Sequence, residues 1–94
     1  MTHAFTVVSG DFEWDERKAR ANLAKHGVSF EEAATVFADP RVVILDDGGV
    51  EGRLVAIGLS ARLRILCVVH VQRGERDRII SARRATAADA AFYA

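Results

Sequence analysis

Polar and charged side chains in the second half of the chain recur at the alternating spacing of β-strands. Side chains two residues apart on a strand share one face of a sheet, so this spacing can gather residues that are far apart in the sequence. The residues concerned are Glu51, Arg53, Arg64, His70, Ser81 and Arg83. Their types suit cleavage of RNA without a metal ion. That reaction needs a base for the 2′-hydroxyl proton, cations beside the phosphate and an acid for the leaving oxygen.

Each residue type has a candidate role in such a reaction. Glu51 or His70 is the candidate base. The arginines can hold a phosphate through two parallel hydrogen bonds, and Ser81 can orient an oxygen. The spacing leaves a second interpretation open, in which the same charges form cross-strand ion pairs that only stabilise the sheet.

Other kinds of site find little support in the sequence. The three histidines and the single cysteine show no spacing typical of metal ligands. No glycine-rich phosphate loop follows a predicted strand, so we expect neither a metal nor a cofactor. Cys67 lies in an apolar run and is predicted to be a buried thiol.

The formal net charge is zero, but the charge is unevenly distributed along the chain. Residues 1–47 hold nine Asp and Glu against five Lys and Arg, whereas residues 48–94 hold four Asp and Glu against eight Arg. Arginine presents a planar fork of donors that suits phosphate and carboxylate. The second half is therefore expected to face RNA or an acidic protein, unless its arginines are simply solvated strand edges.

Turn signals predict the strands that would position the candidate residues. After Pro40 the pattern predicts strands over 41–46, 53–59, 64–72 and 77–83. Connections this short favour an antiparallel meander. On the third strand the alternate residues from Ile65 to Val71 are all apolar, and we expect them to face the core. Arg64 and His70 would then lie on the face away from the core. On the last strand Ile79, Ser81 and Arg83 are expected to share a face.

Cap signals predict two helices before those strands. The first would begin after the N-cap Asp15 and end at Gly27, which supplies a left-handed residue. The second would begin with a capping box of Ser29 and Glu32. It would end at Asp39-Pro40, because the residue before proline disfavours helical geometry.

The order of helices first and strands after predicts one α+β domain over residues 1–94. We expect two N-terminal helices packed on a four-stranded antiparallel sheet, with a short C-terminal helix over 86–93. Residues 1–11 are expected to be a flexible arm, with a weak strand signal over 4–8. No apolar run approaches the roughly 18 residues of a membrane span. The first residues lack a signal-peptide pattern, so we expect a cytoplasmic protein.

From residue 12 to residue 93 the chain resembles the BrnT toxin family. The resemblance rests on the order and spacing of several short motifs. They are Phe12-Glu13-Trp14-Asp15 with Lys18 and Asn22, Lys25-His26-Gly27-Val28 with Phe30 and Ala33, Val36-Phe37 with Asp39-Pro40, Ile57-Gly58, Arg78-Ile79-Ile80-Ser81-Ala82-Arg83, and the final helix ending at Tyr93.

This resemblance implies the toxin half of a type II toxin–antitoxin pair, with a RelE-like fold. Such toxins are endoribonucleases that stop growth by cutting RNA. The implied partner is a BrnA-like antitoxin with a ribbon-helix-helix domain, through which the complex binds and represses its own operator DNA. A homodimer of the toxin within a heterotetramer is also expected.

The resemblance also implies site residues. Glu51 and Arg53, Arg64, and Ser81 and Arg83 match the family's catalytic pattern, and Lys18 matches a basic residue of its first helix. His70 often corresponds to an aromatic residue and is a lesser candidate for RNA binding. Gly52 stands where many relatives carry an acidic residue. An alternative therefore stays open, in which the chain is a non-catalytic subunit or co-repressor that clasps an acidic antitoxin segment.

Overall fold

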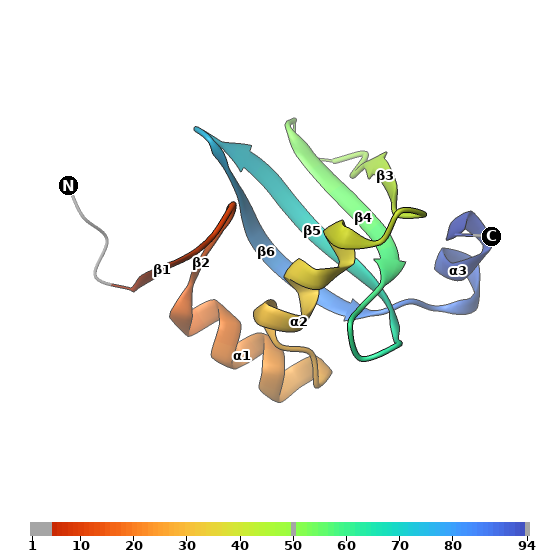
Figure 1. Cartoon of the computed structure of the whole chain (residues 1–94), viewed down its shortest axis with the longest axis horizontal. Coiled ribbons are helices and arrows are strands. Elements are labelled where there is room, and N and C mark those ends of the chain that lie inside the picture. Colours follow the sequence, from red (N-terminus) through yellow and green to blue (C-terminus); the bar gives the residue numbers. More distant parts are fainter. Residues whose placement is uncertain (1–4, 50, 94) are drawn as a thin grey trace.

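A six-stranded sheet forms the centre of the molecule (Figure 1). The computed structural model describes residues 5–49 and 51–93. The strand order is β1-β2-β6-β5-β4-β3. The strands are β1 (Thr6–Ser9), β2 (Phe12–Asp15), β3 (Val43–Asp46), β4 (Arg53–Leu59), β5 (Ile65–Arg73) and β6 (Arg76–Arg84).

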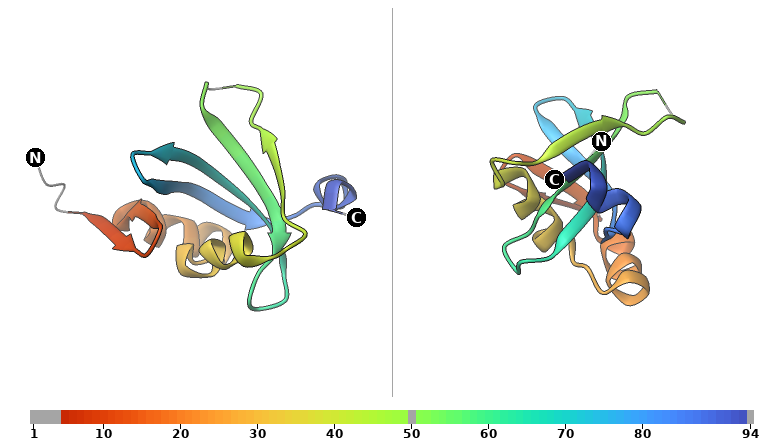
Figure 2. Two further views of the ribbon diagram at one scale, coloured as in Figure 1. Left: turned by 45° about the horizontal axis from the view of Figure 1, so that its top comes forward. Right: turned by 90° about the vertical axis from the view of Figure 1, so that its right-hand side faces the viewer.

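Two helices cover one side of this sheet, and a third packs against β4. Helices α1 (Glu16–His26) and α2 (Phe30–Thr35) lie together on one side, and the short 3-10 helix η1 (Val36–Ala38) continues α2. Helix α3 (Ala87–Tyr93) lies apart from them, beside the end of β4 (Figure 2). The predicted strands and helices are all present, to within a few residues at their ends.

The predicted cap residues act as expected in the first two helices. Asp15 accepts hydrogen bonds from the backbone N–H groups of Arg17 and Lys18, and Gly27 ends α1 with a φ of 70°. The hydroxyl of Ser29 accepts from the N–H of Glu32. The carboxylate of Glu32 turns away from this capping box and binds elsewhere.

The predicted four-stranded antiparallel sheet is wrong in size and in direction. The hairpin of β1 and β2 joins the sheet because β2 pairs in parallel with β6. Only Phe12 and Glu13 make this pairing, opposite Asp77 and Arg78. A contact so brief between distant segments leaves no periodic pattern in the sequence, so only the antiparallel part from β6 to β3 was predictable.

The predicted core face of β5 is also wrong. Leu66 and Val68 face the core under α1 and α2, His70 packs against Phe37 of η1, and all three are at most 3% exposed. The opposite residues Val69 and Val71 are only half-buried. Both faces of β5 are largely apolar, so the period of two could not decide which one the helices cover. The helices cover the face that carries the histidine.

Strand β6 departs from a regular alternation. Its pairing with β5 shifts by one residue between Val69 and His70, as a β-bulge does. Ile79 and Ala82 therefore both lie in the core, at 1% exposure each. The prediction that Ile79 shares a face with Ser81 and Arg83 is wrong because of this extra residue.

Buried polar contacts hold the helices on the sheet. The Asn22 amide of α1 donates hydrogen bonds of 2.9 Å to the Val28 carbonyl and 2.7 Å to the Ala82 carbonyl. It also accepts a hydrogen bond from the N–H of Ala82. One side chain of α1 thereby fixes the backbone of β6.

Candidate functional site

The side of the sheet that faces away from α1 and α2 carries several of the predicted site residues, and we call it the open face. The registers of β4, β5 and β6 align its side chains in three rows across the sheet. The first row is Arg53, Val71 and Arg78; the second is Val55, Val69 and Ser81; the third is Ile57, Cys67 and Arg83.

This grid brings Arg53, Ser81 and Arg83, three of the six residues that the sequence pattern grouped, onto one surface. Adjacent strands are about 4.8 Å apart and alternate residues about 6.7 Å apart, so the Cα atoms of these arginines lie within about 12 Å of Ser81. The guanidinium groups can therefore converge on one anion above the apolar second row. Arg53 and Ser81 are half-buried.

Arg78 is a member of the open face that the sequence reasoning missed. Its guanidinium forms an ion pair of 2.7 Å with the carboxylate of Glu13 on the neighbouring strand β2. The pair could not be found without knowing that β2 lies beside β6. A partial signal existed, because Glu13 alternates with Phe12 and Trp14 and so points away from their apolar side.

Arg83 is held by the C-terminal helix. Its Nη1 lies 2.6 Å from the carboxylate of Asp89 and 3.2 Å from the carbonyl oxygen of Arg84. The Arg83 guanidinium and the N–H of Thr86 hold the pKa of Asp89 well below its usual range. The same ion pair raises the pKa of Arg83. Arg83 therefore stays charged, and its side chain remains 46% exposed.

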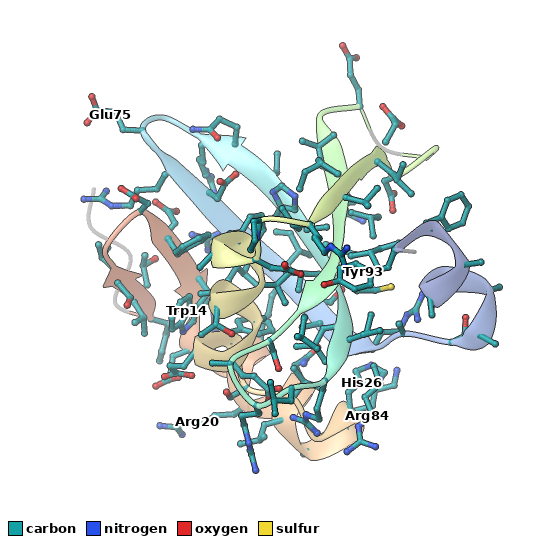
Figure 3. All side chains as sticks on the ribbon, turned by 45° about the vertical axis from the view of Figure 1, so that its right-hand side comes forward. Trp14, Arg20, His26, Glu75, Arg84 and Tyr93 are labelled. Carbon is teal, nitrogen blue, oxygen red and sulfur yellow. The ribbon has the colours of Figure 1, made fainter. Side chains whose placement is uncertain are left out.

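Helix α3 covers the third row of the open face. Ile57 and Cys67 are each 2% exposed, and burial raises the pKa of the Cys67 thiol to about 11. The prediction of a buried thiol is confirmed. The hydroxyl of Tyr93 donates a hydrogen bond of 2.6 Å to Asp39, which attaches the far end of α3 (Figure 3). The first and second rows remain uncovered by this helix.

Glu51 and Arg64 lie at opposite ends of the sheet. Glu51 is exposed in the turn before β4, and Arg64 precedes β5, at the far end of the β4–β5 hairpin. The seven residues of β4 separate them by about 20 Å. Glu51 therefore cannot contact Arg64, and the two residues do not belong to one site.

Arg64 belongs to a buried network on the helix side. Its guanidinium forms an ion pair with Glu32, donates from Nε to Oε2 at 2.9 Å, and donates to the Gly27 carbonyl at 3.0 Å. The Ser60 hydroxyl donates to the same carboxylate at 2.7 Å. The hydrogen bond from Arg64 holds the pKa of Glu32 below its usual value. Arg64 thus ties the start of α2 to the β4–β5 turn.

His70 and Lys18 also lie off the open face. The His70 imidazole is buried between Phe37 and Asp77, with Nδ1 3.2 Å from the Asp77 carboxylate. The expectation that His70 lies away from the core is wrong. Lys18 is exposed on α1, on the other side of the sheet from Ser81.

The described residues offer no group of three or more His, Cys, Asp or Glu side chains placed to hold a metal ion. Among the same residues, no helix is long and apolar enough to cross a membrane. What the open face offers is a cluster of arginines and a hydroxyl around a half-buried apolar floor. Such a surface can bind a phosphate and stabilise negative charge that develops on it.

Comparisons with known proteins place this arrangement in a family. A model described as "Ribonuclease toxin, BrnT, of type II toxin-antitoxin system" matches residues 14–89. The crystal structure of the Brucella abortus ribonuclease toxin BrnT is 30% identical, with a TM-score of 0.64. The match covers 78% of this chain and 92% of that one. A comparison with curated proteins gives no match. The chain therefore belongs to the BrnT family of ribonuclease toxins of type II toxin–antitoxin systems.

Proposed function

We propose that this chain is a metal-independent endoribonuclease whose RNA substrate lies across the open face. The observation that carries the proposal is that Arg53, Arg78 and Arg83 share one side of the sheet with Ser81. Their fixed positive charges would stand beside a phosphate as it gains negative charge, which is the role that a metal ion plays in other nucleases.

The residues of the open face have distinct proposed roles. Arg83, oriented by Asp89, and Arg53 contact the scissile phosphate from the two sides of the second row. Ser81 hydrogen-bonds a phosphate oxygen. Val55 and Val69 provide an apolar floor for a base or ribose.

Glu51 is the proposed general base. It is exposed two residues before Arg53, at the end of the sheet where the first row lies. A carboxylate there can accept the 2′-hydroxyl proton once the arginines hold the phosphate. Arg64 is excluded from this group by its position, and Lys18 would contact only RNA that extends to the helix side.

The test is induced expression of Arg83→Ala, followed by growth and total RNA integrity. Removing one charged donor from the transition state is expected to reduce cleavage about 10²–10³-fold. Arg83→Lys keeps the charge but loses the fork, and it should be impaired as well. Arg73→Ala, an exposed arginine at the far end of β5, is the control. A folded Arg83→Ala protein that still destroys RNA would refute the assignment.

Metal independence has its own measurement. Purified protein is incubated with RNA in the presence and absence of EDTA. Since guanidinium groups supply the charge in this proposal, the cleavage rate should be unchanged by the chelator. Loss of cleavage that Mg²⁺ restores would contradict it. The ends of the products, mapped within the RNA, distinguish endonucleolytic from terminal cleavage.

We further propose that the antitoxin which the family implies is BrnA-like, with a ribbon-helix-helix domain. The toxin would form a homodimer within a cytoplasmic heterotetramer that represses its own operator. The apolar side chains that the structure leaves exposed, such as Ile44 on edge strand β3 and Phe92 on α3, suit a protein partner. Co-purification with the neighbouring gene product and a band shift on upstream DNA test these points.

One observation favours the alternative of a non-catalytic antitoxin-binding subunit. Two of the three arginines on the open face already contact carboxylates, Glu13 and Asp89. A carboxylate of an acidic partner could replace either of them. Intact RNA after expression of the folded wild-type protein would favour this alternative.

A further inference from the structure

Cations also gather where α1 ends, outside the open face. Lys25 and His26 form the last turn of α1. Arg62 lies in the β4–β5 turn, and Arg84 is the last residue of β6. We call these four residues the basic end.

Two contacts bring the elements that carry the basic end together. Asn22 of α1 binds Ala82 of β6. His26 follows Asn22 by about one helical turn, and Arg84 follows Ala82 by two residues. The Gly27 carbonyl, directly after His26, accepts from Arg64 beside the β4–β5 turn. His26 and Arg84 accordingly lie close together in Figure 3.

The charges of the basic end are not neutralised by the acidic residues around them. Within residues 5–49 and 51–93, the ion pairs involve Arg17, Arg64, His70, Arg78 and Arg83 but none of these four side chains. The buried carboxylate of Glu32 is already bound by Arg64 and Ser60. Lys25, Arg62 and Arg84 are exposed.

A shallow cavity lies beside Arg84. Its volume is about 340 Å³, and its lining comprises Arg64, Ile65, Arg84, Ala85 and Ala90. Two arginines therefore contribute to the lining of this cavity, together with three apolar residues. Arginine side chains suit the binding of a phosphate.

The β4–β5 turn presents an apolar side chain next to these cations. Leu63 has a φ of 63° and is 78% exposed. A left-handed conformation strains a leucine, and exposure of its apolar side chain to water does not stabilise the fold. Strain of this kind is characteristic of functional sites. Leu63 is adjacent to Arg62 in the sequence, so a base of an RNA whose phosphate binds Arg62 could contact it.

The basic end is continuous with the open face through two adjacent residues. Arg83 lies on the open face and Arg84 on the helix side, because successive side chains of a strand point to opposite faces. One flexible ligand that passes around the end of β6 would contact both arginines. A single RNA strand has that length and a phosphate at every step.

We propose that the basic end is a second RNA-binding site, which holds backbone phosphates of the strand on one side of the cleavage point. This inference rests on the proposed cleavage at the open face. It assigns Arg62, Arg84 and Lys25 to phosphates and Leu63 to a base. Longer RNA would then bind more tightly than RNA that spans the open face alone.

The test measures binding separately from cleavage. The probe is a fluorescent 2′-O-methyl oligouridine of roughly 12 nucleotides, which lacks the attacking hydroxyl. The variant is Arg62→Gln/Arg84→Gln, which keeps side-chain length and removes two charges. The control is Arg73→Gln/Arg76→Gln, with the same loss of charge at the β5–β6 turn. That turn contains Glu75, far from Arg84 and His26 in Figure 3.

Anisotropy is recorded between about 50 and 200 mM salt. We expect Arg62→Gln/Arg84→Gln to weaken binding about tenfold or more and to reduce the slope of log K against log salt by about 1.4, the value for two phosphate contacts on a single strand. The control pair should match wild type. Melting curves confirm that both variants are folded, and Arg62→Gln alone, at the turn, serves if the double variant is not.

Equal weakening by the control pair would overturn the proposal, because only total charge would then matter. If Arg62→Gln/Arg84→Gln weakens binding of a peptide of about ten glutamates more than it weakens binding of RNA, the proposal is also overturned. The basic end would then be a protein-binding surface. Cleavage by wild type with no effect of Arg62→Gln/Arg84→Gln on binding removes this inference and leaves the proposed function. If the basic end binds RNA but the wild-type protein does not cleave it, the proposed cleavage is refuted and the RNA-binding site remains.

Discussion

The two sides of the central sheet are built from the same strands, but their charged side chains have different roles. On the helix side, the half-buried Arg64 is bound to Glu32 and the buried His70 to Asp77. On the open face, Arg53 and Arg83 keep part of their side chains in solvent. The difference shows that residue type alone does not make a site. An arginine whose donors are all directed at buried acceptors stabilises the fold, and one with free donors can bind a ligand.

This comparison makes a separable prediction for each side. Substitutions on the helix side should change the free energy of unfolding, and substitutions on the open face should change cleavage. Adjacent residues on one strand, such as Arg83 and Ala82, fall on opposite sides of the division. Mutations one residue apart should therefore have different consequences.

The largest expected effect is on the open face. Arg53→Ala should reduce the cleavage rate about 10²–10³-fold, because it removes a charged donor from the phosphate. The melting temperature should change little, since Arg53 makes no side-chain hydrogen bond or ion pair within the described residues. Cleavage of a short RNA and thermal melting measure the two quantities. A large loss of stability with normal cleavage would break the comparison.

Glu32→Gln should produce the opposite result. It removes the charge of the buried Glu32 carboxylate and weakens its hydrogen bonds with Ser60 and Arg64, which is expected to cost about 1–3 kcal/mol of unfolding free energy. Cleavage per folded molecule should persist. The neighbouring exposed residue supplies the control as Glu31→Gln. Urea denaturation measures the stability, and a Glu32→Gln protein as stable as wild type would show that the network contributes nothing.

The same carboxylate predicts how stability depends on pH. The folded protein holds the pKa of Glu32 below its ordinary value of 4.5, because Arg64 and Ser60 hydrogen-bond its charged form. A group whose pKa is lowered by folding stabilises the protein above the unfolded pKa, and this contribution is lost as the pH falls further. Stability should therefore decline below about pH 4.5, and less steeply in Glu32→Gln. Parallel pH profiles of the two proteins would contradict this.

The smallest expected effect concerns Leu63. Glycine adopts a positive φ without the cost of roughly 1–2 kcal/mol that a side chain incurs there. Leu63→Gly should therefore raise stability by about 0.5–1 kcal/mol, after the greater flexibility of glycine in the unfolded chain is counted. If Leu63 contacts RNA, affinity should fall in the same variant. A variant that is less stable than wild type would show that the turn is not strained.

The local elements were predictable because their signals lie within a few residues. Asp15, Gly27 and Ser29 mark helix ends through contacts with their own neighbours. The hairpins of β4, β5 and β6 have short turns, so their antiparallel pairing followed. Arg53, Ser81 and Arg83 share one face because of this pairing. The sequence pattern grouped them with Arg64 and His70, which lie on the other face, and the catalytic roles of all of them stay predictions.

What the sequence did not reveal depends on contacts between distant residues. The covered face of β5 is decided by the helices, and its two apolar faces look alike in the sequence. The bulge near His70 shifts Ile79 to the core without a glycine or proline to mark it. Glu32 looked like half of a capping box, because nothing near it in the sequence shows that Arg64 lies beside it.

The position of β6 has a consequence for the synthesis of the protein. This strand lies near the C-terminal end of the chain yet pairs with β2 near the other end, and Asn22 reaches Ala82 across 60 residues. Contacts so distant along the chain form only after both segments have left the ribosome. Ser81 and Arg83 lie on β6 itself and are synthesised well after β2 and α1. A nascent chain that has not yet released β6 therefore has no assembled open face, and the cell meets this surface only once β6 has been synthesised and has paired.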